Sequence, residues 1–135
     1  MYDRYVKGEI ARLKAELRAL EKDCVVCYPQ VECRYDSILV FDDGRILKAQ
    51  IKYTDQKSSK DSYIVDLRKE TLNNGKKRVY TKNEIDVILL YIKIIDDVLW
   101  IPPELFDNKQ SLSFKIGPTK NNQQKFIRFA KDYIW

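Results

Sequence analysis

The sequence contains no histidine among its 135 residues. This absence excludes Ser-His-Asp and Cys-His activation of a nucleophile, and it excludes zinc sites with histidine ligands. Any catalysis therefore has to use carboxylates, amides, lysine, tyrosine or a hard metal ion.

Cysteine and long apolar runs are also scarce. The three cysteines are Cys24, Cys27 and Cys33, and no second ligand pair accompanies the first two to close a four-ligand zinc site. A redox role for that pair stays open, although such dithiols normally lie at a helix start and these lie in a strand-like run. The longest apolar run, 87–95, is interrupted by a lysine and is far shorter than the ~20 residues that span a membrane. The charged segment 1–10 differs from a signal peptide, so we expect a cytoplasmic protein with reduced thiols.

What is present is typical of one globular domain covering 1–135. Hydrophobic residues make up 44% of the chain and aromatic residues 12%, and a chain of this length buries roughly 65–70% of its unfolded surface. The formal net charge is +5, and residues 53–80 hold the largest share, with seven basic and four acidic side chains. A short basic stretch is typical of an anion-binding surface, although a solvated loop has the same composition.

Hydrophobic spacing predicts the order of helices and strands. Residues 4–22 carry apolar side chains at intervals of four and three, which predicts an amphipathic helix whose apolar stripe is Val6, Ile10, Leu13, Leu17 and Leu20. The predicted strands cover 24–28, 37–41, 45–52, 62–67, 87–95, 98–101 and 111–116, and a second amphipathic helix covers 121–134. Turn signals lie at 42–44 and 73–75, a polar loop is predicted for 53–62, and 81–84 matches a helix capping box.

The first predicted hairpin brings three polar residues together. Asp36 stands at the start of one strand, and Gln50 and Lys52 lie on one face of the next. If the turn is centred on its Asp-Gly pair, Gln50 and Lys52 lie level with 35–37, so the three side chains converge. Carboxylate and amide oxygens bind hard divalent cations, and a lysine adds positive charge near an attacking water or a phosphate oxygen. The set is typical of metal-assisted hydrolysis of a phosphodiester.

These residues resemble a known motif. Gln50-Ile51-Lys52 begins fourteen residues after Asp36, and the segments 7–11, 34–36 and 49–52 follow in the expected order. Together they resemble the PD-(D/E)XK nuclease superfamily, and within it the homing endonucleases encoded by group I introns. The resemblance implies an α/β, restriction-endonuclease-like core in which helices flank a mixed central β-sheet. It also implies Mg²⁺ as cofactor, replaceable by Mn²⁺, and double-stranded DNA as substrate.

The resemblance assigns a role to each position. Asp36 is implied as the main metal ligand, and the Gln50 side-chain oxygen and the Ile51 carbonyl complete the metal ligands. Lys52 orients or activates water, and Glu9 on the first helix holds a metal-bound water or a second metal. Gln50 stands where the superfamily usually has an acid, which removes one negative charge, and a tyrosine stands where the motif has proline before Asp36.

Each of these residues also has an ordinary structural interpretation. Glu9 fits a solvated acid near the start of a helix, with Glu16 on the same face as an alternative helix acid. Asp36 fits a turn or cap residue, and Lys52 fits a strand lysine that reaches solvent.

Basic and amide side chains in the middle of the chain are the candidates for DNA contact. They are Lys57, Lys60, Asn73, Asn74, Lys76, Lys77 and Arg78. Lysines suit phosphates, whereas asparagine and arginine can read base edges in the major groove. One active site cuts one strand, so cleavage of both strands predicts a homo-oligomer, a dimer or a tetramer. The segment 126–135 either forms its interface or packs on its own sheet.

The function implied by the resemblance is a metal-dependent, sequence-specific endonuclease that cuts both strands of duplex DNA and thereby promotes intron homing. Two alternatives stay open. One is a Holliday-junction resolvase-like nuclease that recognises four-way shape. The other is a catalytically inactive DNA-binding module, which Gln50 in the place of an acid suggests.

Overall fold

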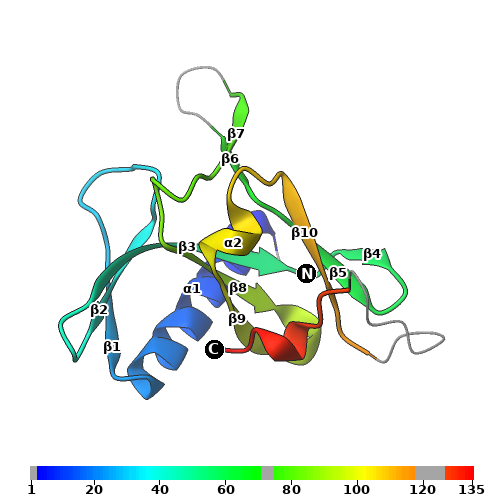
Figure 1. Cartoon of the computed structure of the whole chain (residues 1–135), viewed down its shortest axis with the longest axis horizontal. Coiled ribbons are helices and arrows are strands. Elements are labelled where there is room, and N and C mark those ends of the chain that lie inside the picture. The colour runs from blue at the N-terminus through cyan, green and yellow to red at the C-terminus, as the bar shows by residue number, and fades with distance from the viewer. Residues whose placement is uncertain (1–2, 71–74, 118–126) are drawn as a thin grey trace.

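A five-stranded mixed sheet lies at the centre of the computed structural model, which describes residues 3–70, 75–117 and 127–135. The strand order is β1 (Cys24–Cys27), β2 (Ser37–Phe41), β3 (Ile46–Thr54), β8 (Val87–Ile92) and β9 (Asp97–Ile101). Only the β3–β8 pair is parallel among the pairs of this sheet (Figure 1). The predicted turn at 42–44 closes the β2–β3 hairpin, and Gly44 there has a φ of 95°, a conformation that glycine adopts without strain.

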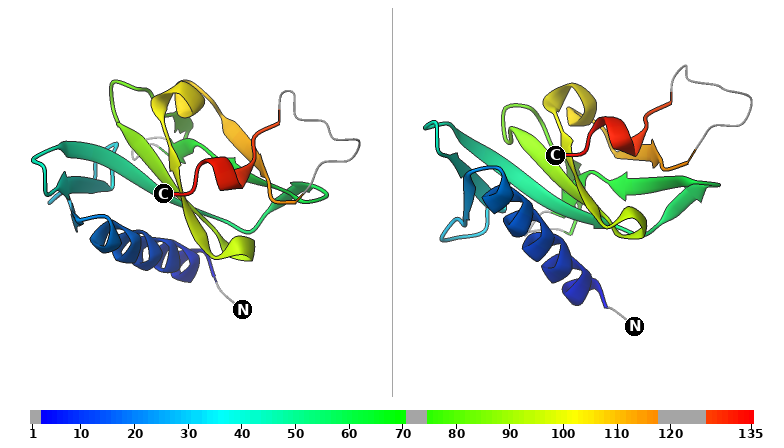
Figure 2. Two further views of the ribbon diagram at one scale, coloured as in Figure 1. Left: turned by 60° about the horizontal axis from the view of Figure 1, so that its bottom comes forward. Right: turned by 90° about the horizontal axis from the view of Figure 1, so that it is seen from below.

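The helix α1 (Arg4–Glu21) covers one face of this sheet (Figure 2). Asp3 caps its start by accepting the Val6 N–H at 2.9 Å. The side that meets the sheet is made of Ala11, Ala15 and Ala19, each at most 1% exposed. The apolar stripe predicted from the spacing faces away from the sheet, because small alanines let the helix approach the strands closely and the larger side chains lie opposite them.

The other face of the sheet is covered by a three-stranded sheet and a short helix, and a separate two-stranded sheet projects from the body of the protein (Figure 1). One small sheet has the order β10 (Ser111–Lys115), β5 (Ser62–Asp66), β4 (Lys57–Ser59), and the other pairs β6 (Arg68–Glu70) with β7 (Lys77–Val79). The short helix α2 (Pro103–Phe106) adds Phe106 to the core on this side. All six residues of β8 are buried. Ile88, Leu90 and Ile92 pack in the core on this side of the sheet, whereas Val87 and Leu89 pack in the core between the sheet and α1.

Several boundaries differ from the predictions. The strand β3 runs on to Thr54 and β4 lies inside the predicted loop 53–62, because both gain partners in the sheets. The strand β8 ends at Ile92, and a 3₁₀ turn, Lys93–Ile95, follows. At 81–84 the capping contacts form but close only a turn, because β8 begins at Val87 and leaves no room for a helix.

The predicted helix over 121–134 is wrong where the structure describes it. Residues 127–135 contain only a short 3₁₀ helix, Ala130–Asp132. The chain instead runs beside β9, where the Trp100 N–H donates to Tyr133 O at 2.8 Å and the Trp135 N–H donates to Val98 O at 3.0 Å. These bonds saturate an exposed strand edge, and they place the C-terminal residues on the central sheet of the same chain. Residues 121–126 of the prediction lie outside the described residues. None of the described helices is long and apolar enough to span a membrane.

Candidate active site

Asp36 is held in place by the neighbouring strand. Its N–H donates to Ala49 O at 3.1 Å, and its two carboxylate oxygens accept the Ile51 N–H at 3.1 Å each. The Ser37 hydroxyl donates to Oδ1 at 3.1 Å. Burial raises the pKa of Asp36 to about 6, against the hydrogen bonds and two nearby lysines that lower it. The carboxylate is therefore costly to ionise in the metal-free protein, and a cation beside it would favour its charged form.

Gln50 lies on β3, and Asp36 directly precedes β2. The two residues lie level with each other, because Ser37 pairs with Ala49 across the hairpin. Its side chain is 7% exposed, and its Oε1 accepts no hydrogen bond from any residue that the structure describes. A buried polar atom without a partner costs about 1–3 kcal/mol. Ligation of a cation by that oxygen removes the cost, so the Asp36 carboxylate and the Gln50 amide fit a hard divalent metal ion.

A purely acidic metal site does not form here. Within 3–70, 75–117 and 127–135, no group of three or more Asp, Glu, Cys or His side chains is placed to hold a metal ion. A cation at Asp36 would therefore rely on one carboxylate, the Gln50 amide and backbone oxygen such as that of Ile51.

The side chain of Lys52 extends from β3 to the first residue of β6. Its Nζ donates to Arg68 O at 3.1 Å and lies 5.4 Å from the centre of the Tyr80 ring. Burial lowers the pKa of Lys52, whereas the carboxylates of Asp66 and Asp36 raise it. Lys52 thus combines a fixed position with a proton that it holds less firmly than a surface lysine does.

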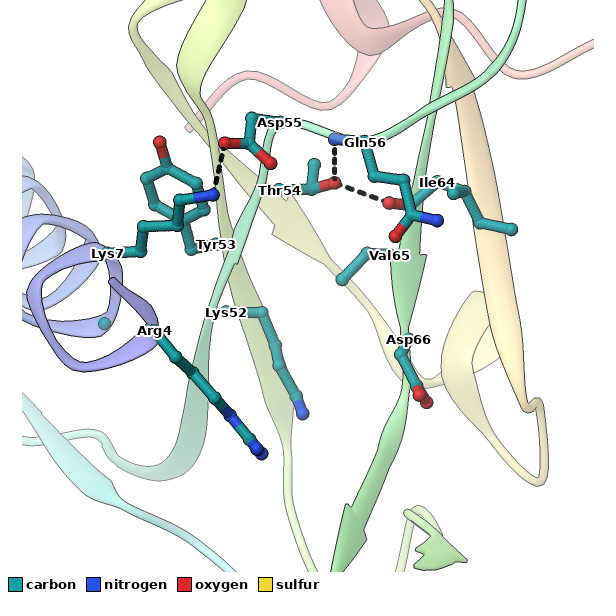
Figure 3. A pocket seen from close by; sticks show the side chains of 11 residues that line it. Arg4, Lys7, Lys52, Tyr53, Thr54, Asp55, Gln56, Ile64, Val65 and Asp66 are labelled. Carbon is teal, nitrogen blue, oxygen red and sulfur yellow. Dashed lines mark hydrogen bonds and ion pairs between the residues drawn. The ribbon is translucent and has the colours of Figure 1, made fainter. Parts of the chain in front are cut away.

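A cavity of about 400 Å³ opens between α1, β3 and β5, and Lys52 lines it. Figure 3 shows Lys52, Arg4 and Asp66 directed into the same space. At one end, Lys7 forms an ion pair with Asp55 at 2.8 Å. The cavity offers two cations, Arg4 and Lys52, to an anionic group that enters it.

Two residues that line the cavity, Arg4 and Asp66, are not part of any motif in the sequence. Arg4 is one of several cations on the first helix, and only the packing of α1 directs it toward Lys52. Asp66 is bound by Arg68 at 3.0 Å and by Lys77 at 3.3 Å. Burial raises the pKa of Asp66, but the hydrogen bonds from these two cations outweigh it and bring the pKa to about 2. A polar residue at the end of a strand was the only signal that could have marked it.

Glu9 does not line the cavity that contains Lys52, but it lines a second hollow together with Arg4. Arg12 binds its two oxygens at 2.6 and 3.1 Å and lowers the pKa of Glu9. The same arginine holds Glu16, the alternative helix acid, at 2.7 Å. Arg4, Lys7 and Gly8 are the α1 residues that line the cavity with Lys52. The implied role of Glu9 at a metal stays a prediction.

The β6–β7 hairpin projects from the body of the protein (Figure 1) and carries part of the predicted DNA-contacting set. Two of its cations form ion pairs with acidic residues outside the hairpin. Lys77 binds Asp66, and Arg78 binds Glu84 at 2.8 Å. Glu84 also holds Arg34 at 2.9 Å, which joins the hairpin to the segment that leads into Asp36.

The remaining candidates for DNA contact are placed as follows. Lys57 is exposed on β4, Lys60 is exposed directly after it, and Lys76 is exposed directly before β7. Asn73 and Asn74 lie outside the described residues. The exposed lysines therefore stand on two elements, β4 and the β6–β7 hairpin, that follow the strand bearing Lys52.

Comparisons with known proteins identify the family and the fold of the chain. A family model described as PD-(D/E)XK endonuclease matches residues 2–135. Among solved structures, the chain is similar to "a bacterial homing endonuclease: I-Ssp6803I", with a TM-score of 0.75 and 24% sequence identity. The match covers 98% of this chain and 89% of that one, and it confirms the predicted α/β fold class. No curated protein matches the chain.

Proposed function

The chain belongs to the PD-(D/E)XK endonuclease family, as the motif predicted, and from this premise we propose that it is a metal-dependent endonuclease for duplex DNA. We propose further that it cuts both strands at a specific sequence, in the manner of a homing endonuclease. The observation that carries the proposal is the unpaired, buried Gln50 oxygen level with the restrained Asp36 carboxylate, with Lys52 on the same strand.

Asp36, Gln50 and the Ile51 carbonyl are the residues that would hold Mg²⁺, or Mn²⁺ in its place. When bound, a divalent cation supplies a Lewis acid that draws charge from the phosphate. The raised pKa of Asp36 supports this assignment, since a carboxylate that is costly to ionise alone is stabilised by a cation. Gln50 in the place of an acid lowers the negative charge of the site by one, which weakens metal affinity without removing the ligand oxygen.

Lys52 and Arg4 supply the positive charge that the chain itself contributes. The Lys52 Nζ, fixed by the Arg68 carbonyl, can orient a water molecule and exchange a proton with it, because burial lowers its pKa. The Arg4 guanidinium points into the same cavity and can donate to non-bridging phosphate oxygens. Together they stabilise the negative charge that grows on the phosphate as the bond breaks.

The DNA lies, in this proposal, across β4 and the β6–β7 hairpin. A two-stranded ribbon fits the major groove, and the exposed cations on it suit phosphates and guanine edges. Cutting both strands requires two copies of the active site, so the active species is a homo-oligomer.

The test uses a plasmid library that carries a randomised duplex segment, incubated with the protein and Mg²⁺ or with EDTA. Sequencing of the cut ends reports activity, specificity and site symmetry together. Asp36→Ala and Lys52→Ala are expected to lose cleavage and keep DNA binding, whereas Lys109→Ala, which changes an exposed lysine in a turn, is expected to behave as wild type. Metal-dependent cleavage by the Asp36→Ala variant would refute the assignment.

The same experiment separates the two other functions. Cleavage of four-way junctions regardless of sequence, with no specific site on linear duplex, would identify a junction-resolving nuclease. DNA binding without cleavage, together with no stabilisation of the protein by Mg²⁺ or Mn²⁺, would identify an inactive DNA-binding module.

A further inference from the structure

The outer face of α1 carries an unusual amount of exposed apolar surface. Its members, which we call the outer stripe, are Val6, Ile10, Leu13, Leu17 and Leu20. Leu13, Leu17 and Leu20 are 54%, 57% and 64% exposed, Val6 is 36% exposed, and Ile10 is half-buried. They lie opposite the alanines that pack on the sheet. Monomeric proteins rarely expose apolar residues in a continuous row, so this face is expected to contact a partner.

The spacing of the outer stripe fits another helix. Intervals of four, three, four and three residues are those of the seam between two packed helices, in which each apolar side chain inserts between side chains of the facing helix. The stripe is also nearly symmetric about Leu13, with Val6 and Leu20 at its two ends. A two-fold axis through Leu13 would therefore place Val6 of one copy opposite Leu20 of the other, a small side chain against a large one.

The charges beside the outer stripe are compatible with an identical partner. On one side, Lys7 and Lys14 bind aspartates in the segments that follow β3 and β8, at 2.8 and 2.9 Å. On the other side, Arg12 is bound between Glu9 and Glu16 at 2.6 and 2.7 Å. Because these charges are paired within their own subunit, two copies can approach with little repulsion. The same pairing gives a nucleic acid or an anionic membrane little to attract it to this face.

The two ends of α1 are complementary in shape. At the C-terminal end, a hollow is lined by Leu20, Val25, Val40 and Phe41 together with polar neighbours. At the other end Tyr5 is 77% exposed. Tyr5 lies eight residues before Leu13, and Leu20 lies seven residues after Leu13. A second copy packed antiparallel therefore brings its Tyr5 to the hollow beside Leu20 of the first copy.

We infer that the outer stripe is a self-association surface, on which α1 of a second copy packs antiparallel about a two-fold axis near Leu13, with the partner's Tyr5 seated against Leu20 and Val25. The dimer itself does not depend on the nuclease assignment. Its consequence, that two active sites are joined for cleavage of both strands, rests on the proposed function.

Sedimentation of the full chain over a micromolar concentration series tests the inference. Wild type is expected to sediment as a dimer or larger assembly, and the double variant Leu13→Glu/Leu17→Glu as the 16.1 kDa monomer, with self-association at least ~100-fold weaker. The control is Ile94→Glu, which changes a residue 59% exposed outside α1 and is expected to remain dimeric. A monomeric wild type, or a folded double variant that sediments like wild type, would overturn the inference.

Disulfide trapping provides the second measurement. In a Cys27→Ser background, which removes an exposed thiol, Leu13→Cys is expected to form a covalent dimer under mild oxidation, whereas Ile94→Cys is not. Equal trapping of both variants would contradict a two-fold axis near Leu13. On supercoiled plasmid the Leu13→Glu/Leu17→Glu variant is expected to nick more than it linearises. Sedimentation and trapping give their answers even if no cleavage occurs, so a failed interface and a failed nuclease assignment are distinguishable.

Discussion

Replacing Asp36 with asparagine is expected to destroy the metal site and at the same time to stabilise the metal-free protein at neutral pH. Folding raises the pKa of this carboxylate from 3.8 to about 6 because the folded protein buries it. The folded state therefore binds the Asp36 proton more tightly than the unfolded chain does. The stability contributed by this proton is fully present below pH 4 and is lost as the pH rises through 6.

The size of the effect follows from the shift. Each pKa unit corresponds to about 1.4 kcal/mol, so a shift of about two units amounts to about 3 kcal/mol at pH 8. Partial solvent access to the side chain lowers the expected figure to about 2 kcal/mol. Asparagine cannot ionise, and its amide oxygen can still accept the Ile51 N–H that now binds the carboxylate. The Asp36→Asn variant should thus be more stable than wild type by about 2 kcal/mol at pH 8, and by progressively less as the pH falls toward 4.

The assay is urea unfolding at several pH values between 5 and 8, first in EDTA and then in Mg²⁺ or Mn²⁺. Metal is expected to stabilise wild type, because it binds only the folded protein, and to leave the Asp36→Asn variant unchanged. The matched control is Asp43→Asn in the exposed hairpin turn, where the Arg45 N–H and guanidinium hold the pKa of Asp43 below its usual value. That substitution should change stability in the opposite direction. If the Asp36→Asn variant is less stable than wild type at pH 8 in EDTA, or if its advantage does not shrink toward pH 5, the buried Asp36 charge does not destabilise the metal-free protein.

Three further substitutions test other parts of the site. Tyr80→Phe removes a buried hydroxyl that has no hydrogen-bond partner among the described residues, and it keeps the ring beside Arg34 and Lys52. This substitution should raise the free energy of unfolding by about 1 kcal/mol. A loss of stability in thermal unfolding would contradict this expectation. Arg4→Ala should slow single-turnover cleavage by about 10- to 100-fold while stabilisation by metal stays the same, and unchanged cleavage would remove Arg4 from the site. Arg78→Ala should weaken duplex binding in a fluorescence titration by about 1–3 kcal/mol and relax specificity at one base pair, whereas equal weakening on every sequence would assign Arg78 to a phosphate.

The β2–β3 hairpin shows what local sequence signals could predict. A tight turn and the alternation of side chains along two strands determine the register, and the register brings Asp36 level with Gln50. The motif residues therefore pointed to the correct strands and the correct family before any tertiary contact was known.

The helix α1 shows where such signals mislead. Its apolar spacing correctly predicts a helix, but the spacing alone does not say which face meets the sheet. The alanine face packs there because its small side chains allow close approach, and the outer stripe is left exposed. The C-terminal residues have the composition of an amphipathic helix, yet the unpaired edge of β9 offers them hydrogen bonds that a helix would forgo.

The family, the chemistry of the candidate metal ligands and the hairpin that carries them were predictable from the sequence, because they depend on residue type and on contacts between neighbours along the chain. Three relations depend on the tertiary structure: β3 pairs in parallel with β8, Arg4 and Asp66 line a cavity with Lys52, and Arg12 binds Glu9, which is not among the residues that line this cavity. The first two relations join segments distant in sequence, and packing and hydrogen bonding across the whole core select them from many arrangements that the local pattern permits equally.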